Sequence, residues 1–294
     1  MVLEWRLLLK MTKKIIFIAD AFSHQHTGGA ELHDAVVVDF FKDQDILHDA
    51  KNTSAITIDY IKNNTDKIWF ISNFVALKNV CKALLAKECE YYIYEHDYKF
   101  SKVRNPIHFP DFLCPPNDLM NFNFYASAKK VICLSKMHRE IFDKNLNLEN
   151  IVNINCSMWS DEQLELFKRL QKPHKNGKFA VIKTNNPTKR MPQTIEFCRS
   201  RNIPFDLIAS QNYEEFINIL ANYTGLAFMT GHPEPTPRVA IEAKMLNCKF
   251  LAPKQLISVA HEDYFHLSGL EMVEEVRKMR DEALEKFMEW FYEA

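Results

Sequence analysis

Short apolar runs alternate with helical patterns along the whole sequence, and this alternation restricts the fold more than any other feature. Runs such as Ile15–Ile18 and Val131–Leu134 are typical of strands that are buried on both faces of a sheet. Segments with helical spacing separate these runs, which is the pattern of β-α-β units around a parallel sheet. The sequence therefore predicts the α/β class.

The same pattern fixes the expected elements in each half of the chain. In the first half we expect strands at 15–18, 56–58, 68–71, 91–94, 131–134 and 151–154, with helices near 75–86 and 136–144. In the second half we expect strands at 179–182, 205–208, 226–229 and 249–251, helices at 193–201, 213–221 and 238–247, and an amphipathic helix at about 270–292. Ser135 is the expected N-cap of the helix that follows it.

A charged helix and a polar turn separate these halves. We therefore expect an N-terminal, acceptor-side domain over residues 1–158 and a C-terminal, nucleotide-sugar-binding domain over 159–294 that ends in a helix crossing between the two. Residues 1–10 are interpreted as an extension in front of Met11. The proline-containing segment 97–125 has no clear period, and a loop of this length usually has a functional reason.

Glycine is scarce, with six residues among 294, and this excludes two familiar nucleotide-binding classes. Only Gly28 and Gly29 are adjacent, whereas the dinucleotide fingerprint and the P-loop need closely spaced glycines. The formal net charge of -1 argues against a surface that binds nucleic acid throughout. One local exception is the stretch 165–206, which contains ten Lys and Arg but three Asp and Glu.

Cysteine usage and hydropathy indicate a cytoplasmic protein. The seven cysteines are odd in number and lie mostly in apolar runs, which favours reduced thiols over disulfides or a zinc site. No apolar run reaches the length of about 18–20 residues that spans a bilayer. Asp43 and Asp45 form a D-x-D pattern like that of metal-dependent transferases, but the pattern follows a helix instead of a strand. We therefore expect no bound metal.

Polar side chains with ligand-binding chemistry follow four of the predicted strands, where parallel α/β proteins bind their ligands. Gly28 and Gly29 open a helix, where free N–H groups attract an anion or approach a sugar closely. A simple tight turn explains this pair equally well. His96 follows the strand 91–94 and can bond a ligand hydroxyl or act as a base.

The other two segments lie in the second half. Lys183, Lys189 and Arg190 surround a predicted helix start and suit a departing diphosphate, although a solvated basic surface is the alternative. Glu242 lies among apolar neighbours on the predicted helix 238–247. A carboxylate in such a place needs a hydrogen-bonding partner, and a diol matches its acceptor oxygens.

Glu234 and Glu242 have seven residues between them and are followed by a helix-strand segment at 243–252. This arrangement resembles the E-x7-E signature of the retaining glycosyltransferases of family 4, which have the GT-B fold. Matching segments occur in the same order at Gly28–Glu31, His96–Asp97, Ala128–Ser135 and Lys183–Lys189. Two departures are the turn Pro235–Pro237, which is glycine-rich in the family, and Lys183, where the family has arginine.

The resemblance implies two Rossmann-like β/α/β domains that face a central cleft and a nucleoside diphosphate sugar, expected to be UDP-linked, as donor. Glu242 would bind the ribose hydroxyls and Glu234 the transferred sugar, while Lys183 and Lys189 would stabilise the diphosphate. No further cofactor is implied. The implied catalytic residues are His96, Glu234 and Lys189, and the implied donor-binding residues are Gly28, Gly29, Lys183, Arg190, Thr236, Pro237, Arg238, Val239 and Glu242.

The acceptor and two alternative functions stay open at this point. A surface glycan or lipid-linked saccharide is the family's usual acceptor, and a hydroxymethylated DNA base is a second candidate because the basic stretch 165–206 could follow a DNA backbone. A sugar-nucleotide epimerase shares the fold and the donor site. A catalytically inactive nucleotide-binding protein is the other alternative. The sequence does not indicate an oligomeric state.

Overall fold

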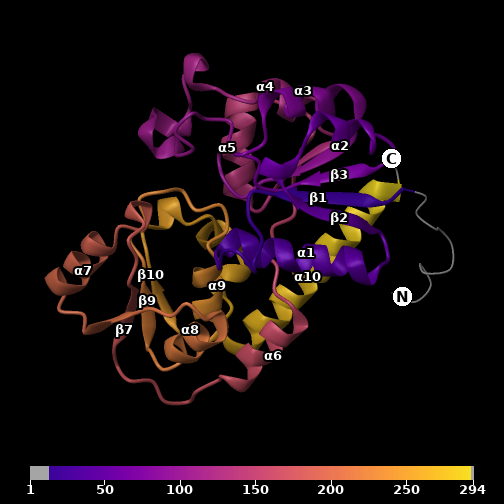
Figure 1. The fold of residues 1–294 in the computed structure, drawn as a ribbon. Helices are drawn as coiled ribbons and strands as arrows, with labels where there is room; N and C mark the ends of the chain where they lie inside the picture. Colours follow the sequence, from indigo (N-terminus) through magenta and orange to yellow (C-terminus); the bar gives the residue numbers. More distant parts are fainter. Residues whose placement is uncertain (1–12, 293–294) are drawn as a thin grey trace.

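A computed structural model describes residues 13–292, which form two α/β domains with one parallel sheet each (Figure 1). The predicted α/β class is therefore confirmed, and the expected extension at residues 1–10 lies outside the described residues. The first sheet has the order β2-β1-β3-β4-β5-β6, and the second has the order β10-β9-β7-β8. The strands are β1 (Ile15–Ala19), β2 (Leu47–Asn52), β3 (Ile68–Ile71), β4 (Glu90–Tyr94), β5 (Lys130–Cys133), β6 (Ile151–Asn153), β7 (Phe179–Ile182), β8 (Phe205–Ile208), β9 (Gly225–Ala227) and β10 (Lys249–Leu251).

Helices connect the strands in both domains. The apolar runs predicted as strands at 15–18 and 68–71 form β1 and β3, and every residue of these two strands is buried. Ser135 caps α5 as predicted, because its Oγ accepts a hydrogen bond from the His138 backbone N–H at 3.2 Å. The helices are α1 (Gly29–Asp43), α2 (Ile58–Lys62), α3 (Asn79–Glu88), α4 (Phe122–Ala126), α5 (Lys136–Leu146), α6 (Asp161–Arg169), α7 (Met191–Ser200), α8 (Tyr213–Leu220), α9 (Arg238–Met245) and α10 (Gly269–Tyr292).

One predicted strand of the first domain is wrong and one strand was not predicted. The segment 56–58 is not a strand, because Thr57 caps α2 by accepting a hydrogen bond from the Tyr60 N–H at 3.1 Å. The strand at this edge of the sheet is β2, whose sequence is polar. It pairs only with β1 and therefore does not need the apolar run of a central strand.

The segment 97–125 is ordered and largely built from proline-initiated 3-10 turns. These turns cover Pro106–His108, Pro110–Phe112 and Pro116–Asp118, and α4 follows them. Tyr98 and Phe100 are completely buried in the core of the first domain. The prolines therefore initiate short turns, from which Phe109 and Phe112 pack against this core.

The long helix α10, yellow in Figure 1, packs on both domains. Met272 and Val276 near its start belong to the core of the second domain. Phe287 and Phe291 near its end belong to the core of the first domain, where the Phe291 ring lies 5.0 Å from that of Tyr92. No helix among residues 13–292 combines the length and the apolarity needed to cross a membrane.

Candidate functional site

The loop between β9 and α9 carries Glu234 and is bonded directly to the first domain. The Ser135 hydroxyl donates to the Pro235 carbonyl at 2.6 Å, and the Thr236 hydroxyl donates to the Leu134 carbonyl at 3.2 Å. Leu134 and Ser135 lie just after β5, at the carboxyl edge of the first sheet. The structure therefore brings the strand ends of both sheets together at the junction of the domains.

Glu234 and Lys189 form an ion pair at this junction. Lys189 ends a 3-10 turn at Pro187–Lys189, and its Nζ lies 2.7 Å from Glu234 Oε1. The same oxygen accepts a hydrogen bond from the Thr230 hydroxyl at 2.9 Å. Glu234 is 8% exposed, and its Oε2 has no hydrogen-bonding partner among residues 13–292. One oxygen is thus held by protein groups while the other has no protein partner in the described part of the chain.

Glu242, one turn inside α9, also has one carboxylate oxygen that is bonded by protein donors and one that is not. Its Oε1 accepts hydrogen bonds from the Tyr213 hydroxyl at 2.8 Å and from the Trp159 indole N–H at 3.2 Å, and it lies 3.4 Å from Arg238 Nε. Burial and the negative charge of Glu242 raise the pKa of Tyr213 well above its ordinary value, so the phenol stays a donor. The predicted partner of Glu242 exists within the protein, yet Oε2 has none in the described part of the chain.

Arg238 links the starts of α9 and α1. Its guanidinium lies 4.4 Å from the Trp159 ring centroid and donates to the Met158 carbonyl in the segment after β6. A methyl group added to Gly29 would lie 3.6 Å from Arg238 Cδ, an ordinary van der Waals contact, so the start of α1 lies beside this side chain. Two of the predicted donor-binding segments, around residues 29 and 238, are therefore neighbours.

Helix starts near the junction lack side-chain caps. Gly28, Arg190 and Pro237 precede α1, α7 and α9, and none of them makes a capping hydrogen bond. By contrast, α6 and α8 are capped by side chains of Ser160 and Asn212. Uncapped N–H groups at the positive end of a helix are suited to bind an anion.

His96 lies after β4 in a buried polar network that the sequence did not predict. Its Nε2 is 2.8 Å from Asp34 Oδ1, and the Ser72 hydroxyl donates to the other Asp34 oxygen at 2.6 Å. His33 contacts the Tyr94 hydroxyl and lies 3.0 Å from the Ser157 hydroxyl. Burial lowers the pKa of His33 well below 6.5, so this ring is neutral.

Three of the remaining predicted residues occupy the edges of the junction. Lys183 follows β7, is exposed and has no side-chain partner within residues 13–292, so it does not join the Lys189–Glu234 pair. Arg190 lies over Gly231, where a Cβ atom would come within 2.1 Å of its Nε. Val239 is half-buried on α9. Of the three predicted cations, Lys189 alone forms an ion pair within the described residues.

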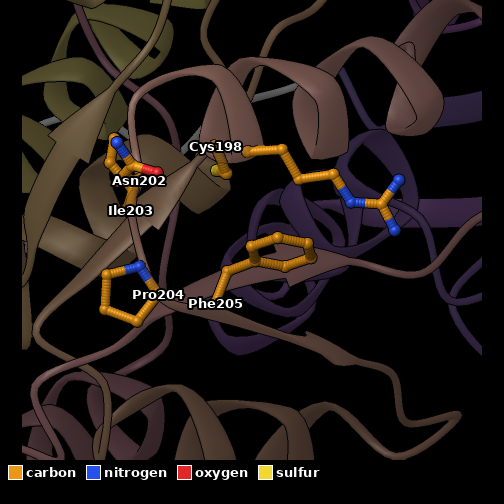
Figure 2. Close-up of a pocket in the computed structure, with 6 residues that line it drawn as sticks. Cys198, Asn202, Ile203, Pro204 and Phe205 are labelled. Atoms are coloured by element: carbon orange, nitrogen blue, oxygen red, sulfur yellow. The ribbon is translucent and has the colours of Figure 1, made fainter.

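Two surface pockets lie away from this junction. One of about 420 Å³ is formed by the end of α7 and the start of β8, and Figure 2 shows Cys198 and Phe205 at it. The other, of about 520 Å³, lies between α3 and residues 119–124. Neither includes a predicted site residue, and the start of β8 is the opposite end of the sheet from Lys189.

His138, behind Ser135, predicts how stability depends on pH. Burial lowers its pKa from 6.5 to about 3, and its Nε2–H is held by the Asp97 carbonyl at 3.0 Å. Below pH 6.5 the unfolded chain binds a proton that the folded protein excludes, so the free energy of unfolding falls as pH decreases. We expect the His138→Gln variant to lose about 2 kcal/mol less than the wild type between pH 7 and pH 5, measured by urea unfolding.

The exposed His48 provides the control for this measurement. His48→Gln should leave the pH dependence unchanged. Equal slopes for the wild type and His138→Gln would show that His138 takes up a proton in the folded state and would contradict the prediction.

Two parallel α/β domains that meet at the carboxyl ends of their strands, joined by a helix that packs on both, define the GT-B fold. Solved structures are similar over nearly their whole length. A glycosyltransferase from Rickettsia africae has a TM-score of 0.55 at 14% identity and covers 96% of this chain and 98% of its own. Anabaena Alr3699/HepE, solved with UDP and glucose, has a TM-score of 0.52 at 14% identity, with 94% and 100% covered.

A third similar structure is an alpha-glucosyltransferase solved with UDP and a 13-mer DNA that contains an HMU base. Its TM-score is 0.50 at 10% identity, with 95% of both chains covered. No protein-family profile matches the sequence, and no curated protein matches it either. The GT-B prediction is confirmed, while identities this low show the fold alone.

Proposed function

We propose that this protein is a glycosyltransferase that moves a sugar from a UDP-linked donor to an acceptor hydroxyl, with retention at the anomeric carbon. The observation that carries the proposal is the matched pair of Glu234 and Glu242. Each has one oxygen bonded by protein donors and the other unpaired, and both flank the uncapped start of α9. A carboxylate oxygen oriented in this way is a selective acceptor for sugar hydroxyls.

The proposed donor lies across the start of α9. Glu242 Oε2 binds the ribose hydroxyls, and Glu234 Oε2 binds a hydroxyl of the transferred sugar. The diphosphate receives positive charge from Lys189 and Arg190 and free N–H groups from α9 and the Gly28–Gly29 helix start. Thr236, Pro237, Arg238 and Val239 hold the loop and the first turn of α9 in place around the donor.

Catalysis would come mainly from positioning and electrostatics. As the bond from the anomeric carbon to the diphosphate oxygen breaks, negative charge grows on the diphosphate and positive charge on the sugar ring. Lys189 stabilises the negative charge on the diphosphate. It remains beside Glu234, whose carboxylate faces the positive charge on the sugar ring. His96 bonds a sugar hydroxyl from the first domain. The acceptor oxygen attacks the same face, which gives retention, and its proton leaves with the diphosphate.

We propose a saccharide hydroxyl as acceptor. The basic stretch 165–206 supports a DNA acceptor less well, because several of its cations are already engaged. Lys168 pairs with Glu165 and Glu274, and Lys175 donates to the carbonyls of residues 221 and 246.

The free state of all seven cysteines supports the expected cytoplasmic location.

A donor screen followed by product analysis tests this function. We expect UDP-sugars to raise the melting temperature more than other nucleotide sugars, and the best donor to give a glycoside with a saccharide acceptor. A changed sugar in the absence of acceptor would indicate the epimerase. Binding without transfer or slow donor hydrolysis would indicate the inactive nucleotide-binding protein. If sugar is transferred to hydroxymethylated duplex DNA and not to saccharides, the acceptor is DNA.

A further inference from the structure

We propose that Asp34 is a positioning residue for His96: it holds the His96 Nε2–H and leaves Nδ1 as the atom that meets a ligand hydroxyl. The orientation of the ring is argued from the first domain alone. Its use in sugar transfer rests on the proposed function. Sequence analysis did not identify Asp34, because a carboxylate five residues inside a helix resembles a solvated surface position.

The Asp34 carboxylate has a fixed orientation. Its side chain is 1% exposed, and its two oxygens have different partners, the Ser72 hydroxyl at 2.6 Å and His96 Nε2 at 2.8 Å. Because Ser72 follows β3 and Asp34 lies on α1, the carboxylate is held from two elements of the first domain. A buried acceptor that is fixed in this way can choose which nitrogen of a neighbouring imidazole carries the proton.

The His96 ring is also fixed in position. The rings of His33 and Tyr94 lie 4.9 Å from it, at interplanar angles of 74° and 67°. His33 cannot take its place at Asp34, since its own nitrogens are engaged by Tyr94 and Ser157. His96 Nδ1, by contrast, has no hydrogen-bonding partner among residues 13–292.

The consequence is a defined hydrogen-bonding role. With its proton on Nε2, neutral His96 presents the Nδ1 lone pair and accepts a hydrogen bond from a hydroxyl. The ring follows β4, at the carboxyl edge of the first sheet where this domain meets Arg238 and the start of α9. Asp34 therefore sets whether His96 can act as an acceptor at the site.

The tautomer of His96 tests the inference without any substrate. Long-range proton–nitrogen NMR at pH 8 distinguishes the two neutral tautomers, and His96→Gln assigns the signal. We expect the Nε2–H form in the wild type and in Asp39→Asn, an exposed control on the same helix. Asp34→Ala should give a mixture or the Nδ1–H form. If that variant does not fold, Asp34→Leu, which keeps the volume, gives the same comparison.

Two NMR outcomes would overturn the inference: the Nδ1–H form in the wild type, or the Nε2–H form unchanged in a folded variant without the carboxylate. Neither depends on an activity, so they separate this inference from the proposed function. If the wild type transfers no sugar, the proposed function fails while the tautomer result still decides the role of Asp34.

Kinetics with the best donor test the catalytic consequence. We expect Asp34→Leu to lower kcat at least tenfold while the donor KM changes less than threefold, because the second domain holds most of the donor. Asp39→Asn should match the wild type. A purely structural role would lower the melting temperature and the amount of active enzyme but leave the kcat of the folded fraction, determined by active-site titration, unchanged.

Discussion

Replacing Lys189 by alanine is expected to lower the rate of sugar transfer by about a hundred- to a thousand-fold, the usual cost of losing one preorganised group that stabilises developing negative charge. Lys189 is the cation that the structure places on Glu234, at 2.7 Å, beside the uncapped starts of α7 and α9. The measurement is kcat with saturating donor. Lys189→Arg should retain more activity than Lys189→Ala, because it keeps the charge.

Lys178→Ala is the matched control for this variant. Lys178 pairs with Asp206 at the opposite end of β7, so its loss should leave kcat within about twofold of the wild type. Equal kcat values for Lys189→Ala and Lys178→Ala would show that Lys189 is not part of the proposed catalytic site. Because the Lys189 side chain is 34% exposed, we expect both variants to fold normally.

Replacing Glu242 by alanine is expected to lower the free energy of unfolding by about 3–5 kcal/mol, the cost of leaving a buried partner charge uncompensated. The side chains of Arg238 and Glu242 are 6% and 4% exposed, and Tyr213 and Trp159 would lose the acceptor for their hydrogen bonds. Urea unfolding measures this change. Glu196→Ala, an exposed substitution on α7, should change stability by less than about 0.5 kcal/mol.

The conservative variant Glu242→Gln separates binding from stability. Its amide oxygen still accepts from Tyr213 and Trp159, but the NH₂ group that replaces Oε2 cannot accept a ribose hydroxyl. We expect a smaller loss of stability and UDP binding weakened by about ten- to a hundredfold, measured by calorimetry, as for a lost hydrogen bond to a charged group. UDP affinity equal to that of the wild type would contradict the donor assignment.

Strands with continuous apolar runs were predictable, and the polar edge strand was not. The predicted ranges 68–71 and 179–182 agree with the structure because β3 and β7 lie inside their sheets, where a strand needs apolar side chains on both faces. The sequence Leu47–Asn52 alternates weakly and is held in place by backbone pairing with β1. Backbone pairing does not require particular side chains. The strand was therefore predicted at 56–58, starting nine residues after the observed start of β2.

The sequence indicated which residues would form the site, but not which residues would form hydrogen bonds with them. A carboxylate on the apolar face of α9 requires a donor, and the sequence therefore indicated that Glu242 has one. It could not indicate Trp159, which comes from the segment after β6, or Tyr213, which comes from α8. The His96 network was missed for the same reason, since Asp34 and Ser72 meet only once the first sheet has formed. The pairing of Lys189 with Glu234 was missed as well, because it depends on how the segments after β7 and β9 meet.

The path of α10 has a consequence for how the chain folds as it is synthesised. The first domain contains every strand of its sheet by residue 153, yet part of its core is filled by Phe287 and Phe291. A nascent first domain therefore leaves the ribosome with an aromatic groove over Phe41, Phe70 and Tyr92 uncovered until the second domain has also emerged. The first half cannot complete its core without the end of α10, so we expect it to finish folding only after the second half has emerged.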